Sequence, residues 1–384
     1  PYQSFSAIAG NTHLIDFDLL VEEGLLAPED FQDVNFGDNP EKVDYALIYQ
    51  ARRPILEKAV QAFLQDDKKK AAFLEFEKAN SSWLTDYAEF MAFIEYFGNK
   101  ALQEWEDKKV VARNEEALDK YRLELANQID YYKVTQYFFF SQWKQLKEYA
   151  NKHHIKIIGD MPIYVSADSV EVWTKPQLFK LDSERKPLYV AGVPADNFSA
   201  DGQLWGNPIY DWPEHEKTGY NWWIYRIHES FKLYDVLRID HFKGFSDFWQ
   251  VDGKAEVAKV GTWEPGPGYS LFKAVKETLG DLPIIAEDLG NIDAKARKLL
   301  ADCGYPGMKI LQFGFYDVTG KSIDAPHRCI PNSVAYTGTH DNEVVNGWYN
   351  NLEPEQQEYV DAYSNRKPIE KVSQAMLRML FATV

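Results

Sequence analysis

The chain has 384 residues, 45% of them hydrophobic and 26% charged, which is enough to bury a large core and suggests either about two to three domains or one large barrel. Its net charge of −17 argues against nucleic acid and anionic membrane surfaces as partners, because both are bound through clustered Lys and Arg. No apolar run approaches the roughly 18 residues of a membrane-spanning helix, so we expect no membrane association.

The cysteine and histidine patterns predict neither a disulfide nor a metal site. Cys303 and Cys329 are the only cysteines, and nothing about them demands a disulfide, so a reducing cytoplasm is the expected compartment. The pair His153-His154 has no partners at metal-ligand spacing and is interpreted as a solvated helix end. We therefore expect no metal and no cofactor.

The first third of the chain differs in pattern from the rest. Residues 1–40 are predicted to form loop and strand regions of a barrel, and residues 41–130 a helical insertion. The insertion contains few Pro or Gly and long charged stretches such as QDDKKKAAFLEFEKA, which are typical of solvated helix faces. Residues 131–384 are predicted to form the main part of the barrel.

From about residue 130 the sequence alternates predicted helices with short, β-rich apolar runs. The helices are predicted at 129–153, 221–232, 270–279 and 293–303. The apolar runs are IKIIGD (155–160), YDVLRID (234–240), PIIAED (283–288), MKILQF (308–313) and SVAYTG (333–338). This alternation is typical of a parallel sheet buried on both faces.

Polar residues at the ends of these runs distinguish two possible sheets, since an open doubly wound sheet and a (β/α)8 barrel both fit the alternation. Four runs end in carboxylate-bearing sequence, at Asp160, at Asp240, at Glu287-Asp288 and at residues 339–342 (THDN). The carboxyl ends of the strands converge on one mouth in a barrel, whereas they spread along an edge in an open sheet. We therefore predict a (β/α)8 TIM-type barrel with helical insertions.

The stretch GVPADNFSADGQLWGNPIYDW (192–212) is rich in Gly, Pro, Asn and Asp and is predicted to be a long loop that acts as a lid. It carries Trp205 and Tyr210 beside Gln203 and Asn207. Aromatic faces and amide groups of this kind suit a sugar, which presents flat apolar faces and hydroxyls. The high aromatic content of the chain, 15%, fits the same reading, although an aromatic-rich core explains it equally well.

The stretch LRIDHFKGF (237–245) places several charged side chains where a buried strand is predicted. Burying an unpaired charge costs roughly several kcal/mol, so a strand interior is an unfavourable place for Arg238, Asp240 and Lys243. A strand that runs into its catalytic end accounts for this cluster.

Asp240, Glu287 and Asp341 are candidates for cleavage of a glycosidic bond, which needs one ionised and one protonated carboxyl group about 5–5.5 Å apart in retaining enzymes. Arg238 lies two residues before Asp240, so it points the same way from a strand and would keep Asp240 ionised. Burial after the apolar run PIIA would raise the pKa of Glu287 so that it keeps its proton. The alternatives are an Arg-paired structural carboxylate at Asp240 and a helix-capping or salt-bridged carboxylate at Glu287.

The chain resembles the 4-α-glucanotransferases of glycoside hydrolase family 77, also called amylomaltases or disproportionating enzymes, which are relatives of the α-amylases. The resemblance covers essentially the whole chain. It rests on PYQSFSAIAGN, GDMPIYV, GVPADNFSADGQLWGNPIYDW, LRIDHFKGF, IIAEDLG and YTGTHDN. Family members usually carry further barrel segments in front and behind, so we expect the natural protein to continue at both ends.

The resemblance implies roles for ten residues of this sequence. Asp240 is implied as the nucleophile, Glu287 as the general acid/base and Asp341 as the stabiliser of the transition state. The residues implied in substrate binding are Arg238, which also orients Asp240, His340, Asp160, Trp205, Gln203, Asn207 and Tyr2.

The implied reaction moves α-1,4-glucan segments from a donor to glucose or a maltodextrin by a retaining double displacement, without a cofactor. The expected partners are maltodextrins, starch- or glycogen-derived α-1,4-glucans and glucose as acceptor. Two alternatives are an α-glucan hydrolase of the α-amylase type, which would use the same carboxylates, and a non-catalytic glucan-binding fragment, which would keep the aromatic residues and need none of the carboxylates.

Overall fold

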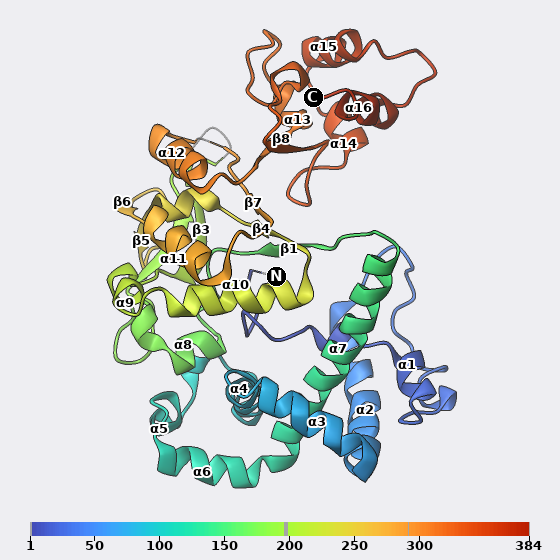
Figure 1. The fold of residues 1–384 in the computed structure, drawn as a ribbon, viewed down its shortest axis with the longest axis vertical. Coiled ribbons are helices and arrows are strands. Elements are labelled where there is room, and N and C mark those ends of the chain that lie inside the picture. Colours follow the sequence, from blue (N-terminus) through green and yellow to red (C-terminus); the bar gives the residue numbers. More distant parts are fainter. Residues whose placement is uncertain (1, 196–198, 291, 384) are drawn as a thin grey trace. The chain divides into compact units, whose positions relative to one another are not determined.

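The computed structural model describes residues 2–195, 199–290 and 292–383, which divide into two compact units (Figure 1). The first unit takes Pro1–Ile157, Tyr164–Asp235 and Trp249–Glu264, and the second takes Ile158–Ile163, Val236–Phe248 and Pro265–Val384. Our division of the sequence at residues 40 and 130 separates barrel segments from an insertion rather than compact units, and it stays a prediction.

Helices dominate the first unit. Its helices are η1 (Thr12–Leu14), α1 (Phe17–Glu22), η2 (Pro28–Asp30), α2 (Tyr45–Leu64), α3 (Asp67–Ala79), α4 (Leu84–Tyr96), η3 (Leu102–Glu104), α5 (Lys108–Val111), α6 (Glu115–Glu124), α7 (Ala126–Lys152), α8 (Val170–Thr174), η4 (Pro176–Leu178), α9 (Trp212–Lys217) and α10 (Asn221–Leu233). The prediction that residues 41–130 are mostly helical is confirmed.

Helix α7 illustrates why these segments are helical. Its buried residues include Ile129, Tyr132, Gln136 and Phe139, which recur every three or four positions and so form one buried face. Helices α2, α3 and α4 pack against α7, as Figure 1 shows. The helix predicted at 129–153 is therefore confirmed, with a start three residues earlier.

The prediction that residues 192–212 form a loop is wrong for residues 192–193 and 203–208, which lie in strands. Strands β2 (Tyr189–Val193) and β3 (Gln203–Pro208) form an antiparallel pair in a four-stranded sheet, ordered β3-β2-β5-β6, with β5 at Asp247–Asp252 and β6 at Thr262–Pro265. Gly192 allows the two strands to approach closely, since a Cβ there would lie 2.4 Å from the backbone oxygen of Gln203. Residues 196–198 of the predicted lid lie outside the described residues.

The second unit contains the parallel strands predicted from the alternating pattern. Its strands are β1 (Ile158–Met161), β4 (Val236–Ile239), β7 (Ile284–Ala286), β8 (Gly307–Ile310) and β9 (Ser333–Tyr336). One parallel ladder runs in the order β1-β4-β7 and a second pairs β8 with β9, while the backbone N–H of Ala286 donates to the oxygen of Pro306 just before β8. Each strand is shorter than predicted, and the run 308–313 leaves the strand after Ile310 and turns into a short helix.

The helices of the second unit follow these strands as the βα pattern predicts. They are η5 (Phe242–Phe245), α11 (Tyr269–Leu279), α12 (Ala294–Cys303), α13 (Leu311–Gly314), η6 (Pro326–Arg328), α14 (Val345–Asn350), α15 (Pro354–Ser364) and α16 (Val372–Leu380). The side chain of Asp293 accepts from the N–H of Ala296 at the start of α12, and Gly304 ends the helix in the left-handed conformation with φ 71°. These cap residues explain why the predicted boundaries of α12 agree with the structure.

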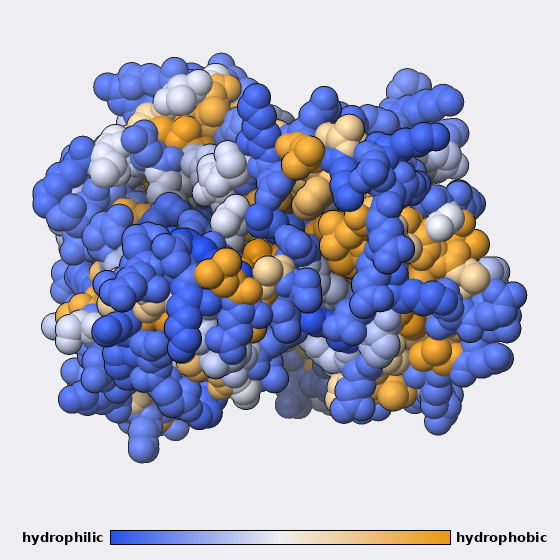
Figure 2. All heavy atoms as spheres, turned by 90° about the horizontal axis from the view of Figure 1, so that it is seen from below, coloured by the Kyte–Doolittle hydropathy of each residue, from blue (hydrophilic) through white to orange (hydrophobic). Residues whose placement is uncertain are grey.

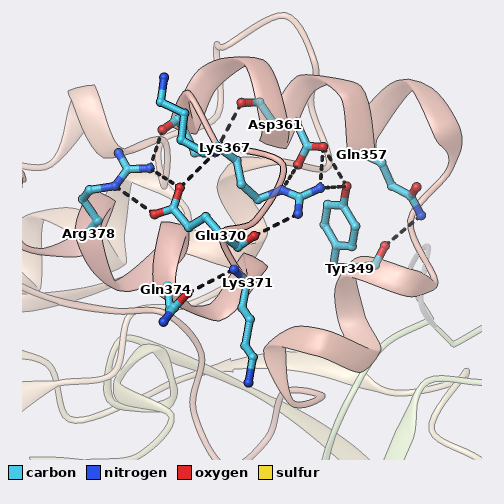
Figure 3. Close-up of polar contacts among 10 residues, drawn as sticks. Tyr349, Gln357, Asp361, Lys367, Glu370, Lys371, Gln374 and Arg378 are labelled. Carbon is cyan, nitrogen blue, oxygen red and sulfur yellow. Dashed lines mark hydrogen bonds and ion pairs between the residues drawn. The ribbon is translucent and has the colours of Figure 1, made fainter.

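Polar contacts fix the last three helices to one another (Figure 3). Nη2 of Arg366 donates to Oδ2 of Asp361 at 2.6 Å and to the hydroxyl of Tyr349 at 3.1 Å, which ties α14 to α15. On α16, Arg378 pairs with Glu370 in the connection before the helix at 3.0 Å, and its Nη2 donates to the backbone oxygen of Ser364 at the end of α15 at 2.9 Å. These contacts hold α14, the helix that directly follows the 339–342 segment.

The surface agrees with the charged composition. Hydrophilic residues cover most of the face in Figure 2, with smaller hydrophobic groups between them. None of the helices in the described part of the chain is long and apolar enough to cross a membrane. Cys303 and Cys329 are both free thiols.

Candidate active site

Arg238 joins two carboxylates that come from neighbouring strand ends. Asp160 on β1 lies opposite Arg238 in the parallel ladder, and Asp240 follows β4 directly. Nη1 of Arg238 donates to the two oxygens of Asp160 at 2.6 and 2.8 Å and to Oδ1 of Asp240 at 2.9 Å. The charges in LRIDHFKGF are therefore paired, which removes the main cost of burying Arg238, whose exposed fraction is 7%.

The alternation of β4 explains this arrangement. Leu237 and Ile239 are fully buried in the packed layer, so Arg238 and Asp240 lie on the opposite face of the strand. The backbone N–H of Asp240 donates to the oxygen of Met161 at 3.0 Å and extends the ladder past the carboxyl end of β4. His241 then takes the left-handed conformation, with φ 48°, and the chain leaves the strand for η5.

Glu287 lies one residue beyond β7 and is held by backbone donors on both oxygens. Oε2 accepts from the N–H of His241 at 2.8 Å, and Oε1 accepts from the N–H of Leu289 at 2.7 Å. The pKa of Glu287 is nevertheless raised to about 7, first because the group is buried and then because Asp240 carries a negative charge nearby. Near neutral pH a substantial fraction of Glu287 therefore keeps its proton.

Asp240 experiences opposing influences. Burial raises its pKa above the ordinary value, the Arg238 guanidinium lowers it, and the carboxylates of Asp160 and Asp341 raise it again. Arg238 favours the ionised form of Asp240, as its position in the sequence predicts, and so offsets part of the cost of burying the carboxylate. It does not bring the pKa of Asp240 below the ordinary value. The mutual repulsion of Asp240 and Glu287 separates their ionisation, so that one is charged while the other keeps its proton.

His340 and Asp341 complete the cluster from the segment after β9. Nε2 of His340 lies 3.4 Å from Oδ1 of Asp341 and 3.9 Å from Oδ2 of Asp160. Their side chains are 53% and 55% exposed, so both are accessible to a substrate. All six residues predicted at strand ends thus belong to the second unit, and five of them are joined by the contacts of Arg238 and His340.

Sequence reasoning named Asp288 as a carboxylate at a strand end but missed two contacts in and beside this cluster. The backbone N–H of His241 donates a hydrogen bond to Glu287, and no residue pattern indicates the left-handed turn that positions this N–H. Asp288 accepts from the N–H of Met308 at 2.7 Å, and a Cβ at Gly307 would lie 2.6 Å from its carboxylate. A glycine at the start of a strand is the one sequence signal for this close approach.

The other four predicted substrate-binding residues belong to the first unit and lie close together there. Nε1 of Trp205 donates to Oε1 of Gln203 at 3.2 Å, and the backbone oxygen of Trp205 accepts from Gln3 at 3.3 Å. Asn207 is buried, and its amide donates to the backbone oxygens of Tyr2 at 3.2 Å and Val165 at 2.9 Å. These bonds join residues 2–3 to strand β3, which carries Trp205.

The cluster in the second unit defines a class of enzyme. Cleavage of a glycosidic bond needs two carboxyl groups, one that carries a proton and one that is ionised, and the environments of Glu287 and Asp240 are suited to these two states. Within residues 2–195, 199–290 and 292–383, His, Cys, Asp and Glu form no group of three that could hold a metal ion. The carboxyl pair is typical of an enzyme that cleaves glycosidic bonds.

Comparisons with known proteins identify the family. The model of glycoside hydrolase family 77, described as 4-alpha-glucanotransferase, matches residues 1–384. The 4-alpha-glucanotransferase of Streptococcus pneumoniae is 54% identical over 385 residues, covering 100% of this chain and 76% of its own length. The enzyme of the same name from Aquifex aeolicus is 41% identical over 381 residues, covering 99% of this chain and 76% of its own length.

Solved structures agree. Amylomaltase from Streptococcus agalactiae, determined in complex with acarbose, has a TM-score of 0.98 and 59% identity and covers 100% of this chain and 77% of its own. Amylomaltase from Corynebacterium glutamicum has a TM-score of 0.73 at 16% identity, with 99% and 51% coverage, and shares the fold. The predicted fold class, a (β/α)8 barrel with helical insertions, is confirmed by the first of these matches.

The chain belongs to the 4-alpha-glucanotransferase family, glycoside hydrolase family 77. It is an enzyme that transfers α-1,4-glucan segments between maltodextrins, with glucose as an acceptor. The two alternatives, an α-glucan hydrolase and a non-catalytic glucan-binding fragment, are not favoured by these relatives.

Proposed function

We propose that Asp240 is the nucleophile of this transfer reaction, Glu287 its general acid/base and Asp341 the stabiliser of the transition state. The observation that carries the proposal is the raised pKa of Glu287, about 7, beside an Asp240 that is paired with Arg238 at 2.9 Å. An acid catalyst needs a proton near neutral pH and a nucleophile needs a negative charge, and these two environments provide both.

In the first half of the reaction, a carboxylate oxygen of Asp240 attacks the anomeric carbon of the donor glucan. Glu287 delivers its proton to the glycosidic oxygen as that bond breaks, and the reducing-end fragment leaves. The product is a covalent glycosyl ester on Asp240. Loss of the negative charge on Asp240 in this step lowers the pKa of Glu287, which favours its role as a base in the next step.

In the second half, Glu287 takes the proton from the 4-hydroxyl of the acceptor, and this oxygen attacks the anomeric carbon of the ester. A new α-1,4 bond forms and Asp240 is released as a carboxylate. Two inversions at the same carbon give net retention. The backbone N–H groups of His241 and Leu289 keep the Glu287 carboxyl group in place while it loses and regains its proton.

The remaining predicted residues bind the sugar. Asp341 and His340 bind hydroxyls of the glucose unit at the cleavage point, and Asp160 holds Arg238 and His340 in position. Tyr2 provides an aromatic platform, and Gln203 and Trp205 cover the donor chain and exclude water, which favours transfer over hydrolysis. Asn207 acts through the backbone of Tyr2, to which its amide donates.

The proposed setting is a reducing cytoplasm. What supports it is the presence of only two cysteines, both free thiols, in a chain of 384 residues. An extract fractionated into soluble and secreted protein, probed with an antibody against this chain, tests the compartment.

Incubation with maltotriose tests the proposed function. A transferase converts it into glucose and longer maltodextrins, because each glycosyl ester is resolved by a sugar. Release of shorter sugars alone would contradict transfer, and absence of any product from a folded protein would contradict catalysis by this chain.

A further inference from the structure

His340 and Asp341 are half-exposed, so their positions depend on the backbone that carries them rather than on packing of their side chains. That backbone, residues 337–343 (TGTHDNE), leaves the end of β9 and enters α14. We call it the 337–343 loop. Within it, Oδ1 of Asn342 accepts from the backbone N–H of Thr339 at 2.8 Å and from its hydroxyl at 3.0 Å, which closes a compact turn around His340 and Asp341.

One buried residue from the neighbouring strand end bonds to both ends of this loop, through its backbone at one end and its side chain at the other. Gln312 lies on α13, two residues after β8, and its exposed fraction is 2%. Its backbone N–H donates to the oxygen of Thr337 at 3.3 Å, and Nε2 donates to the oxygen of Glu343 at 2.9 Å. Residues Ile310 and Tyr336 are partners in the β8–β9 ladder, so the short helix and the loop begin side by side.

The sequence of the loop is adapted to this glutamine. Gly338 has no Cβ, and one placed there would lie 3.0 Å from Nε2 and 3.1 Å from Cδ of Gln312. The loop backbone therefore lies directly on the face of the amide group. At the far end, the Glu343 carboxylate accepts from Nδ2 of Asn351 at 3.0 Å, so Glu343 also joins the loop to the end of α14.

We propose that Gln312 is a positioning residue for the transfer reaction: it fixes the 337–343 loop so that Asp341 meets the sugar in the geometry of the transition state. This rests on the proposed role of Asp341. Gln312 itself contacts no sugar, since it is buried under the loop. A buried donor of fixed length is suited to this task, because small displacements of a catalytic group lower the rate steeply.

The test uses Gln312→Met, which keeps the length of the side chain and removes its hydrogen bond to the backbone oxygen of Glu343, while the backbone bond to Thr337 remains. We expect kcat for transfer to fall by about tenfold to a hundredfold while the KM for the donor changes by less than about twofold, since the transition state is affected more than the bound substrate. Gln142→Met is the matched control: Gln142 is also buried and bonds the backbone of Asp16 at 2.7 and 3.0 Å, in the first unit, and its loss should leave kcat unchanged.

A double-mutant cycle with Asp341→Asn separates positioning from general destabilisation. The assay uses α-glucosyl fluoride as donor, so that the slow variants remain measurable. If Gln312 acts through Asp341, Gln312→Met lowers kcat by less than about threefold in the Asp341→Asn background. Thermal melting of each variant establishes that it is folded, and Gly338→Ala, which pushes the loop away from the same amide, should lower kcat if Gln312→Met does not fold.

The outcomes distinguish the two proposals. A folded Gln312→Met with the parent kcat, or an undiminished loss in the Asp341→Asn background, overturns the positioning role of Gln312 alone. A parent kcat for Asp341→Asn overturns the role of Asp341 in the reaction, and with it this proposal. A KM that rises while kcat is constant also overturns the proposal, because it places Gln312 in ground-state binding.

Discussion

The backbone N–H of His241 donates to Oε2 of Glu287 at 2.8 Å, so the residue that follows the proposed nucleophile holds the proposed acid/base. The left-handed conformation of His241, with φ 48°, is part of the turn that presents this N–H. The position of Glu287 is therefore tied to that of Asp240 through a single residue of backbone. Such direct coupling suits a reaction in which one carboxyl group must follow the charge state of the other.

Asp240→Asn should abolish transfer, because the amide cannot form the glycosyl ester, while the fold is retained because the two side chains are nearly the same size. We expect kcat to fall by a factor of about 10⁴ or more. Asp302→Asn, on the exposed surface of α12 in an ion pair with Lys298 at 2.6 Å, is the control and should transfer normally. A kcat of Asp240→Asn that falls by much less than about 10⁴-fold, in protein free of deamidated enzyme, would contradict the role of Asp240 as nucleophile.

Glu287→Gln should depend on the leaving group of the donor. With maltodextrins the glycosidic oxygen needs a proton, and we expect kcat for ester formation to fall by about 10³-fold. With an α-glycosyl fluoride the leaving group needs no protonation, so ester formation should be largely restored. Equal losses with both donors would mean that Glu287 is not the acid.

Glu287 should also make the stability of the fold depend on pH. Its pKa is raised from 4.5 to about 7 in the folded protein, so between these values the folded state binds more protons than the unfolded state and the free energy of unfolding falls as pH rises. Glu287→Gln removes this fall in the free energy of unfolding, because the amide does not ionise. In urea denaturation, the free energy of unfolding of the variant should equal that of the parent near pH 4 and exceed it by about 2–3 kcal/mol at pH 8. A pH-independent difference would show that Glu287 is not a buried acid.

Much of this site was predictable from the sequence, because strand ends of a parallel fold carry a simple signal. Asp160, Asp240 and Glu287 each lie at the end of an apolar run, and the alternation of β4 explains why Arg238, two residues earlier, meets Asp240. The helices were predictable for a similar reason, since cap residues such as Asp293 mark where they begin.

The parts that escaped prediction depend on contacts between distant segments. Gly, Pro and Asn in 192–212 suggested a loop, yet β2 and β3 pair there because Gly192 permits a close approach that a local pattern does not reveal. Burial of Asp240 depends on the whole surrounding fold, so its raised pKa was not foreseen beside Arg238. The same holds for Gln312, whose partners Thr337 and Glu343 lie more than twenty residues away.

Trp205→Ala should weaken donor binding and admit water. If the ring stacks on a sugar, its loss weakens donor binding by about 1–3 kcal/mol, and the KM for maltodextrin donors rises accordingly. The ratio of hydrolysis to transfer should also increase. Trp263→Ala, at a tryptophan that is 46% exposed on β6, is the matched control and should leave both quantities unchanged. An unchanged ratio in Trp205→Ala would limit this residue to a scaffold role.

The most direct measurement is the identification of the carboxyl group that becomes glycosylated. Glu287→Gln treated with an α-glycosyl fluoride should accumulate the ester, because the variant forms it without an acid and resolves it slowly without a base. Mass spectrometry of rapidly acid-quenched, peptic digests should then find one hexosyl addition on the peptide that contains LRIDHF, at Asp240. A hexosyl addition at another carboxylate, or turnover of the fluoride with inversion and no adduct, would contradict the double displacement at Asp240.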